Sequence, residues 1–145
     1  MSWKSISNSN YSVLLGDLLM QMDGNNPVFK TTVLDKHLNS ANYAHGGFLM
    51  SLLDNTMGNA SYLAFEKNPC VTISMTTHFI KAASNGDELI IKPIVEKKTN
   101  SLCFMKAEVL CNNQIIASGN GIWKVMNKKL PKSVSQKLKD DDGGW

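Results

Sequence analysis

The feature that most constrains the fold is one long apolar segment, residues 46–65, whose pattern predicts a single helix. Its apolar residues cover a wide arc of that helix: Phe48, Leu49, Leu52, Leu53, Met57, Ala60 and Ala64. A surface helix normally carries its apolar residues on one face, so an arc this wide indicates a helix that other elements enclose. The charged and turn-prone residues 66–69, which include Pro69, are expected to end it.

Everything after this helix is expected to be β-structure. Apolar and mostly polar residues alternate, and turn-forming residues stand between the alternating runs. Among them, the pair Asn112-Asn113 predicts a tight hairpin. We therefore expect four strands linked as hairpins, at residues 71–79, 89–95, 103–111 and 115–126. Gly119 and Gly121 in the last strand indicate a bulge, a close approach of two backbones or a loosened edge strand. One enclosed helix with four strands after it and one before it predicts an α+β domain, in which a curved antiparallel sheet wraps the helix.

The N-terminal part of the chain contains a second helical pattern. Leucines at positions 14, 15, 18 and 19 have helical spacing, which predicts a short amphipathic helix over residues 12–22. An extended stretch is expected from Val28 to about Leu38. A length of 145 residues fits one domain, so we assign residues 1–126 to that domain and residues 127–145 to a polar C-terminal tail.

The start of the long helix carries the residues best suited to chemistry. Gly46 and Gly47 leave the backbone N–H groups of the first turn open to an incoming oxygen, and the helix dipole favours negative charge there. Asp54 is a carboxylate on an otherwise apolar helix, where burial would be costly without a partner or a purpose. Asn39, six residues before His45, supplies a side-chain amide donor. Each residue alone has a plain structural interpretation as a turn, a helix start or a solvated acid. Their combination indicates a site for an oxyanion.

This combination resembles the hotdog-fold acyl-CoA thioesterases of the PaaI type. In that family an Asn precedes His-Gly-Gly by six residues, and an Asp or Glu follows eight positions after the first Gly. Here the same spacing runs from Asn39 through His45-Gly46-Gly47 to Asp54. The resemblance extends along the chain to about Met126. It departs from the family pattern at Asn42, Lys81, Ala82, Thr99 and Asn100, where relatives often have Gly, Arg, Pro, Gly and a basic residue.

The resemblance implies a hotdog fold and hydrolysis of an aryl or fatty acyl-CoA to the free acid and CoA. The N–H of Gly46, assisted by Asn39, would polarise the thioester carbonyl. Asp54 would act as general base or as attacking carboxylate, Thr72 would orient the water, and His45 would fix the loop and the helix start. The expected substrate-binding residues are Gly47, Phe79, Lys81, Lys97, Lys98 and Asn100, with the basic ones directed at phosphate groups. Coenzyme A is part of the substrate, and no other cofactor is expected.

The distance between the two main catalytic groups predicts an oligomer. Gly46 and Asp54 are eight residues apart, or roughly 12 Å along a helix at ~1.5 Å per residue, which is too far for both to act on one carbonyl. Relatives pair their protomers so that the residue corresponding to Asp54 in one subunit faces the residue corresponding to Gly46 in the other across a two-fold axis. We therefore expect a homo-oligomer, a dimer of dimers that makes a homotetramer.

Composition excludes several other classes of protein. A formal charge of +3, with many of the basic residues in the tail, argues against a nucleic-acid binder. No apolar stretch approaches the ~20 residues that span a bilayer, and the N-terminus lacks a secretory pattern, so we expect no membrane partner and a cytoplasmic location. Three cysteines form no framework of paired disulfides, and neither they nor His37 and His78 have metal-ligand spacing, so no metal is expected.

Two other functions remain open from the sequence. One is an acyl-CoA-binding sensor without turnover, although sensors of that kind carry a DNA-binding segment and the basic tail is too short for one. The other is a different hotdog thioester enzyme, such as an enoyl-CoA hydratase, whose arrangement of Asp and His is not found here.

Overall fold

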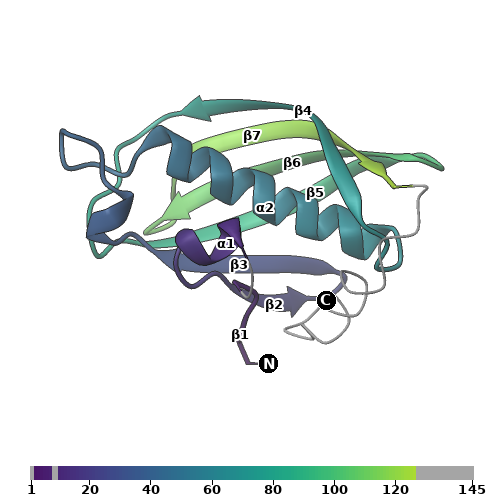
Figure 1. The fold of residues 1–145 in the computed structure, drawn as a ribbon, viewed down its shortest axis with the longest axis horizontal. Helices are drawn as coiled ribbons and strands as arrows, with labels where there is room; N and C mark the ends of the chain where they lie inside the picture. Colours follow the sequence, from purple (N-terminus) through teal and green to yellow (C-terminus); the bar gives the residue numbers. More distant parts are fainter. Residues whose placement is uncertain (1, 8–9, 127–145) are drawn as a thin grey trace.

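The computed structural model describes residues 2–7 and 10–126 of the chain. In chain order its elements are β1 (Lys4–Ser5), α1 (Tyr11–Leu14), β2 (Leu19–Asp23), β3 (Asn26–Thr32), the 3₁₀ turn η1 (Asp35–His37), α2 (Gly46–Ala64), β4 (Cys70–Phe79), β5 (Glu88–Lys98), β6 (Leu102–Cys111) and β7 (Gln114–Val125). The strands form one antiparallel sheet in the order β1-β2-β3-β5-β6-β7-β4. Figure 1 shows this sheet curving around α2, as the α+β prediction required. The predicted tail at residues 127–145 lies outside the described residues.

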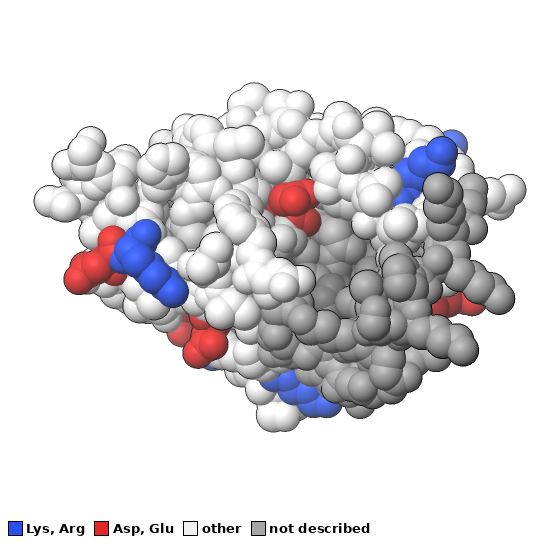
Figure 2. Space-filling model, in the orientation of Figure 1, with Lys and Arg blue, Asp and Glu red and all other residues white. Residues whose placement is uncertain are grey.

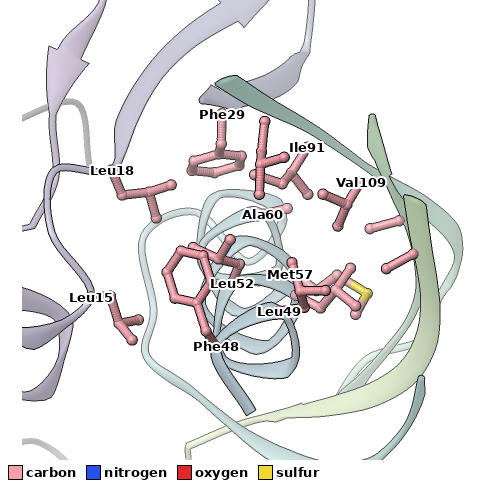
Figure 3. Close-up of a cluster of buried hydrophobic side chains, with 14 of the residues drawn as sticks. Leu15, Leu18, Phe29, Phe48, Leu49, Leu52, Met57, Ala60, Ile91 and Val109 are labelled. Carbon is pink, nitrogen blue, oxygen red and sulfur yellow. The ribbon is translucent and has the colours of Figure 1, made fainter. Parts of the chain in front are cut away.

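The long helix is enclosed as its wide apolar arc predicted. Its buried apolar residues are Phe48, Leu49, Leu52, Leu53, Met57 and Ala60. They pack against the concave face of the sheet, where Phe29, Ile91 and Val109 are fully buried, as Figure 3 shows. Each fully buried Val, Leu, Ile, Phe or Met side chain stabilises the fold by ~1.5–3 kcal/mol when it is removed from water. The helix is therefore held in place by the same residues that close the sheet around it.

The strand order corrects one prediction. We expected β4 and β5 to form a hairpin, but β4 pairs with β7 and β5 pairs with β3. Only β5, β6 and β7 form a meander with tight turns, and the eight residues between β4 and β5 carry the chain across to the opposite side of α2. An alternating pattern reveals that a strand has one buried face, and it does not reveal which strand is its neighbour. Three strands precede α2, not one.

The predicted helix over residues 12–22 is wrong. The helix α1 is a single turn, Gly16 follows it with φ at +84°, and residues 19–23 form the strand β2. Residues 23–26 form the turn of the β2–β3 hairpin, with Gly24 at φ +62°. Leu15 and Leu18 are buried in this conformation also. The spacing of these leucines is therefore compatible with two conformations. One is a helix, and the other is a turn followed by a strand.

Two turn and strand predictions are confirmed by backbone geometry. Asn112 and Asn113 have φ values of +50° and +62°, the left-handed pair that a tight two-residue hairpin needs. Gly121 marks a close approach of two backbones, because a Cβ there would lie 2.4 Å from the carbonyl oxygen of Ser74 in β4. The register against β4 shifts between Thr72 and Ser74, not at either glycine, and the β6–β7 register shifts between Val109 and Leu110. β7 is an interior strand.

Candidate active site

The start of α2 presents the backbone N–H of Gly46, which has no partner among the described residues. His45 is the N-cap residue, and its Nδ1 accepts a hydrogen bond of 2.8 Å from the N–H of Gly47. The N–H of Gly46 makes no hydrogen bond within the part of the chain that the structure describes. Because the helix dipole concentrates positive charge at this end, the Gly46 N–H is suited to bind an oxygen that carries negative charge.

The side chain of Phe79 covers the helix start. A Cβ built on Gly46 would lie 3.2 Å from the Phe79 ring, which is closer than ordinary van der Waals contact. Phe79 is the last residue of β4 and remains 54% exposed. Glycine at position 46 therefore lets an exposed aromatic ring pack against the Cα of the residue that carries the open N–H, and the ring forms an apolar wall at the helix start.

Asp54 has one defined partner, on the strand that runs beside α2. The hydroxyl of Thr72 in β4 donates a hydrogen bond of 2.7 Å to Oδ1 of Asp54. Asp54 is half-buried in the middle of the helix, and Thr72 is exposed. This hydrogen bond fixes the orientation of the carboxylate. The structure thus brings together the predicted carboxylate and the predicted water-orienting hydroxyl.

Gly46 and Asp54 lie on one row of the helix surface, with Met50 between them. Residues four apart stand above one another on an α-helix, so positions 46, 50 and 54 follow each other along the exposed face. The helix is continuous from Gly46 to Ala64, and the two groups are therefore about 12 Å apart along its axis. One protomer holds both groups in fixed positions and does not bring them to a common carbonyl.

Asn39 organises the loop that leads to α2. Its Oδ1 accepts hydrogen bonds from the N–H groups of Ala41 and Tyr43, at 2.9 and 3.1 Å. Its amide NH₂ donates no hydrogen bond in the described part of the chain. Asn42 adopts φ +65°, the left-handed conformation for which relatives often use glycine, and asparagine tolerates it. The departure from the family pattern at position 42 therefore preserves the loop.

The predicted phosphate contacts lie at opposite ends of α2. Lys81 follows the strand that ends beside the helix start, and its Nζ hydrogen-bonds Oε1 of Gln114. The ammonium group of Lys98 lies 4.9 Å from the centre of the Phe65 ring, beyond the last residue of α2. The other three predicted phosphate contacts therefore lie near the C-terminal end of the helix: Lys97, Lys98 and Asn100. A helix of 19 residues is about 28 Å long, so one protomer does not bring Lys81 together with them.

The cysteines of the described chain are not poised as nucleophiles. All three are unpaired thiols. Burial raises the pKa of Cys70 to about 11, and the neighbouring Cys103 adds to that shift. Burial also raises the pKa values of Cys103 and Cys111. Since the thiolate is the reactive form, these residues behave as small apolar side chains at neutral pH.

The surface around the site is poor in charge. Figure 2 shows the face that carries α1 and α2, where most of the described surface is uncharged and the charged groups are few. Within residues 2–7 and 10–126, no three His, Cys, Asp or Glu side chains gather in a way that would hold a metal ion. None of the helices that the structure describes is long and apolar enough to cross a membrane.

A comparison with protein families matches residues 41–117 to the thioesterase superfamily. The chain belongs to the thioesterase superfamily. A Pseudomonas aeruginosa protein provisionally named an esterase is 30% identical to this superfamily member over 114 residues, which are 76% of this chain and 84% of that protein.

Solved structures agree with this assignment at the level of the fold. The E. coli PaaI protein from the phenylacetic acid degradation operon is similar with a TM-score of 0.74 at 22% identity, over 86% of this chain and 89% of that one. A Streptococcus mutans protein bound to acetyl-CoA is similar with a TM-score of 0.69 at 23% identity, over 78% of this chain and 91% of that one. The hotdog fold and the resemblance to PaaI-type thioesterases are thereby confirmed.

The superfamily match contains most of the predicted catalytic residues. Residues 41–117 include His45, Gly46, Asp54 and Thr72, and the range begins two residues after Asn39. The catalytic roles of these residues remain predictions.

Sequence reasoning missed one residue of this thioesterase-superfamily chain. The sequence pattern assigns His37 no role, whereas the structure places it behind the helix start, 5% exposed and with its backbone carbonyl accepting a hydrogen bond from the N–H of His45. The sequence feature that could have pointed to His37 is its position two residues before Asn39, but that spacing does not reveal that its side chain is buried.

Proposed function

We propose that the protein is an acyl-CoA thioesterase that hydrolyses aryl or fatty acyl-CoA to the free acid and CoA. The observation that carries this proposal is that Asp54 and Gly46 lie on one row of α2. The Thr72 hydroxyl donates a hydrogen bond to the Asp54 carboxylate, and the Gly46 N–H has no partner among the described residues. Thioester hydrolysis needs a donor for the carbonyl oxygen and a group that activates or replaces water, and these two groups have those properties.

The reaction follows from the chemistry of these groups. The Gly46 N–H binds the thioester oxygen and stabilises the negative charge that develops there, a contribution of ~10²–10³ in rate for one such donor. Asp54 then either takes the proton of an attacking water or attacks the carbonyl carbon itself to give a mixed anhydride. In both routes CoA leaves as the thiolate and takes up a proton. In the general-base route the oxygen of water enters the acid directly. In the anhydride route, water that attacks Cγ of Asp54 leaves its own oxygen in the carboxylate, and an Asp54 oxygen departs in the acid. Label in the Asp54 carboxylate after a single turnover in ¹⁸O-water would therefore identify the anhydride route.

The same proposal requires two chains for each site. Asp54 of one protomer would act with Gly46 of another, since their separation in one chain is about 12 Å. The sheet edge favours such pairing, because β4 is a ten-residue edge strand with exposed apolar side chains that include Val71 and Ile73. A long apolar edge of this kind is normally covered by another strand or chain. We propose a homodimer as the catalytic unit and its doubling into a homotetramer.

Coenzyme A is the proposed carrier of the acyl group. A Streptococcus mutans protein with this fold was crystallised with acetyl-CoA, which supports a CoA thioester as the substrate class. The phosphate contacts would come from Lys81 near the helix start and from Lys97, Lys98 and Asn100 near the helix end. We place the reaction in the cytoplasm, where the three free thiols of the chain would stay reduced.

The direct test incubates the protein with short-chain, long-chain and aromatic acyl-CoAs and detects released CoA with a thiol-reactive dye. Release of CoA above the uncatalysed rate from at least one class supports the proposal. Thermal stabilisation by acyl-CoA without any release would favour the sensor. Loss of the enoyl absorbance of an enoyl-CoA without release of CoA would favour a hydratase, and either result would overturn the proposed function.

A further inference from the structure

His37 is a buried imidazole that the proposed reaction does not use. It is the last residue of the turn η1, eight residues before the N-cap of α2, and it is 5% exposed. A buried titratable side chain normally has hydrogen bonds that hold it in one protonation state. Its contacts therefore reveal what the residue does.

Three contacts connect His37 to the segment that ends at the helix start. Its backbone carbonyl accepts a hydrogen bond of 2.8 Å from the N–H of His45, the residue before Gly46. Its Nδ1 accepts a hydrogen bond of 2.9 Å from the N–H of Leu34. Its ring stacks on the ring of Phe48, in the first turn of α2, with centroids 3.8 Å apart and planes 10° apart.

These contacts define the protonation state of the ring. Because Nδ1 accepts a hydrogen bond from a backbone N–H, it carries no proton, and the neutral ring has its proton on Nε2. Nε2 is buried and makes no hydrogen bond of normal length and angle within the described residues, although the backbone of Leu15 acts on the ring as a weak hydrogen-bond partner. The N-terminal segment closes this side of the ring, since a Cβ built on Gly16 would lie 3.4 Å from Cε1 of His37.

We propose that His37 is a positioning residue of the thioesterase site, and that its neutral ring fixes the backbone at His45 so that the Gly46 N–H is aimed at the substrate oxygen. This inference rests on the proposed function. Protonation would turn Nδ1 from an acceptor into a donor that faces the donor of Leu34. It would also place a charge against the Phe48 ring in an apolar enclosure. Both changes would loosen the segment that sets the direction of the Gly46 N–H.

The surroundings of His37 favour the neutral ring. Burial lowers its pKa, the positive charge of Lys36 lowers it further, and the backbone of Leu15 opposes these effects. The other charged neighbour in the turn, Asp35, hydrogen-bonds the side chain of Asn85. From α2 the ring stacks on the uncharged Phe48, and from the N-terminal segment it meets Leu15 and Gly16.

The test compares two variants of His37 with a matched destabilised control. His37→Phe keeps an aromatic ring against Phe48 and removes the Nδ1 acceptor, whereas His37→Asn supplies an acceptor near Nδ1 and removes the ring. Val33→Ala deletes fully buried methyl groups in the same segment and leaves His37 intact. Each protein is assayed for kcat and KM between pH 5 and 8, and its thermal stability and oligomeric state are measured.

We expect His37→Phe to lower kcat by ~10–100-fold with KM changed by less than about twofold, because a small misplacement of a catalytic group has that effect. We expect His37→Asn to recover part of the loss. The wild-type loss of kcat that follows protonation of His37 should be absent in His37→Phe. Val33→Ala should lower thermal stability and keep both kcat and the pH profile. An unchanged kcat in His37→Phe, or an equal loss in Val33→Ala, would overturn the proposal.

A second readout does not depend on activity. With ¹⁵N-glycine labelling, the Gly46 amide signal should shift as His37 titrates in the wild type and should not show that shift in His37→Phe. If no acyl-CoA is hydrolysed, the proposed function fails while this experiment still tests His37. A Gly46 signal that ignores the titration of His37 would reject the positioning role even in an active thioesterase.

Discussion

At the scale of single residues, Asp54 is the clearest test of the site. We predict that Asp54→Asn lowers kcat by ~10²–10⁴, the range for a positioned acid or base, while the protein folds and assembles normally. The amide has the size of the acid, and its oxygen still accepts the hydrogen bond from the Thr72 hydroxyl. The measurement is CoA release at saturating acyl-CoA, with circular dichroism and light scattering as controls. Near-normal hydrolysis by a correctly assembled variant would remove Asp54 from the mechanism.

His37 also makes a prediction about stability. Its pKa in the folded protein is lowered, mainly by burial, below the ordinary value of ~6.5. The unfolded chain therefore binds a proton at this residue before the folded chain does, and the free energy of unfolding falls as the pH drops below ~6.5. The contribution is complete above that pH and is lost as the pH falls through the folded pKa. We expect the midpoint of thermal unfolding to fall further between pH 7.5 and 5 in the wild type than in His37→Phe. Equal falls in both proteins would contradict this.

At the scale of secondary-structure elements, two glycines that face Trp123 should respond in opposite ways to alanine. A Cβ at Gly121 would lie 2.4 Å from the backbone oxygen of Ser74 and 2.8 Å from the Trp123 ring, so β7 and β4 would have to separate. Gly58 lies inside α2, and its Cβ would meet Trp123 at an ordinary distance of 3.5 Å. We predict that Gly121→Ala destabilises by ~2 kcal/mol or more, and that Gly58→Ala stabilises by ~0.5–1 kcal/mol through helix propensity.

Chemical denaturation of both variants checks this pair. Because the two substitutions add the same methyl group near the same tryptophan, any general effect of added volume is shared between them. Loss of stability in Gly58→Ala, or a Gly121→Ala protein as stable as the wild type, would show that the backbone distances do not set these costs.

The ends of α2 make a separate prediction about the nucleotide part of the substrate. Lys81 and Lys98 lie at opposite ends of the helix, and exposed lysines act on phosphates mainly as charges that salt screens over ~8 Å at physiological ionic strength. We predict that Lys81→Ala or Lys98→Ala raises KM for acyl-CoA with little change in kcat, since such contacts bind ground and transition states alike. Hydrolysis of a short pantetheine thioester should be nearly unchanged.

The control for these variants is Lys106→Ala, an exposed lysine on β6 to which no substrate contact is assigned. It should leave both substrates unaffected. Equal effects of Lys81→Ala on acyl-CoA and on the pantetheine thioester would assign that lysine to the fold or the acyl pocket instead.

At the scale of the whole molecule, two inactive variants should complement each other. Gly46→Pro removes the catalytic N–H at the first helical position, where proline is compatible with a helix. Asp54→Asn removes the carboxylate. In a hybrid dimer one site joins the intact Gly46 of one chain with the intact Asp54 of the other. Random exchange makes half of the dimers hybrids with one intact site each, so we predict about a quarter of wild-type activity after mixing.

The measurement is CoA release before and after subunit exchange in mild denaturant, with each variant treated alone as the control. No recovery in samples shown by mass spectrometry to contain hybrids would mean that each site lies within one chain. Full activity of a wild-type monomer, identified by light scattering, would lead to the same conclusion.

The amino-acid sequence by itself determined the elements whose signals are local. The wide apolar arc of residues 46–65 predicted the enclosed helix, and its observed end at Ala64 agrees within one residue. The pair Asn112-Asn113 predicted a tight hairpin because few other residues tolerate left-handed backbone at two successive positions. The spacing of Asn39, His45, Gly46 and Asp54 predicted the superfamily, since those residues belong to one loop and the helix that follows it.

Tertiary structure alone decided which distant segments meet. The pairing of β4 with β7, the strand conformation of residues 19–23 and the burial of His37 all depend on partners far away in the chain. Side-chain periodicity records that a face is buried, and it carries no information about the identity of the partner. The same limit applies to function. The sequence predicted that Lys81 and Lys98 contact the phosphates of the same substrate, and only the fold showed that they lie at opposite ends of α2.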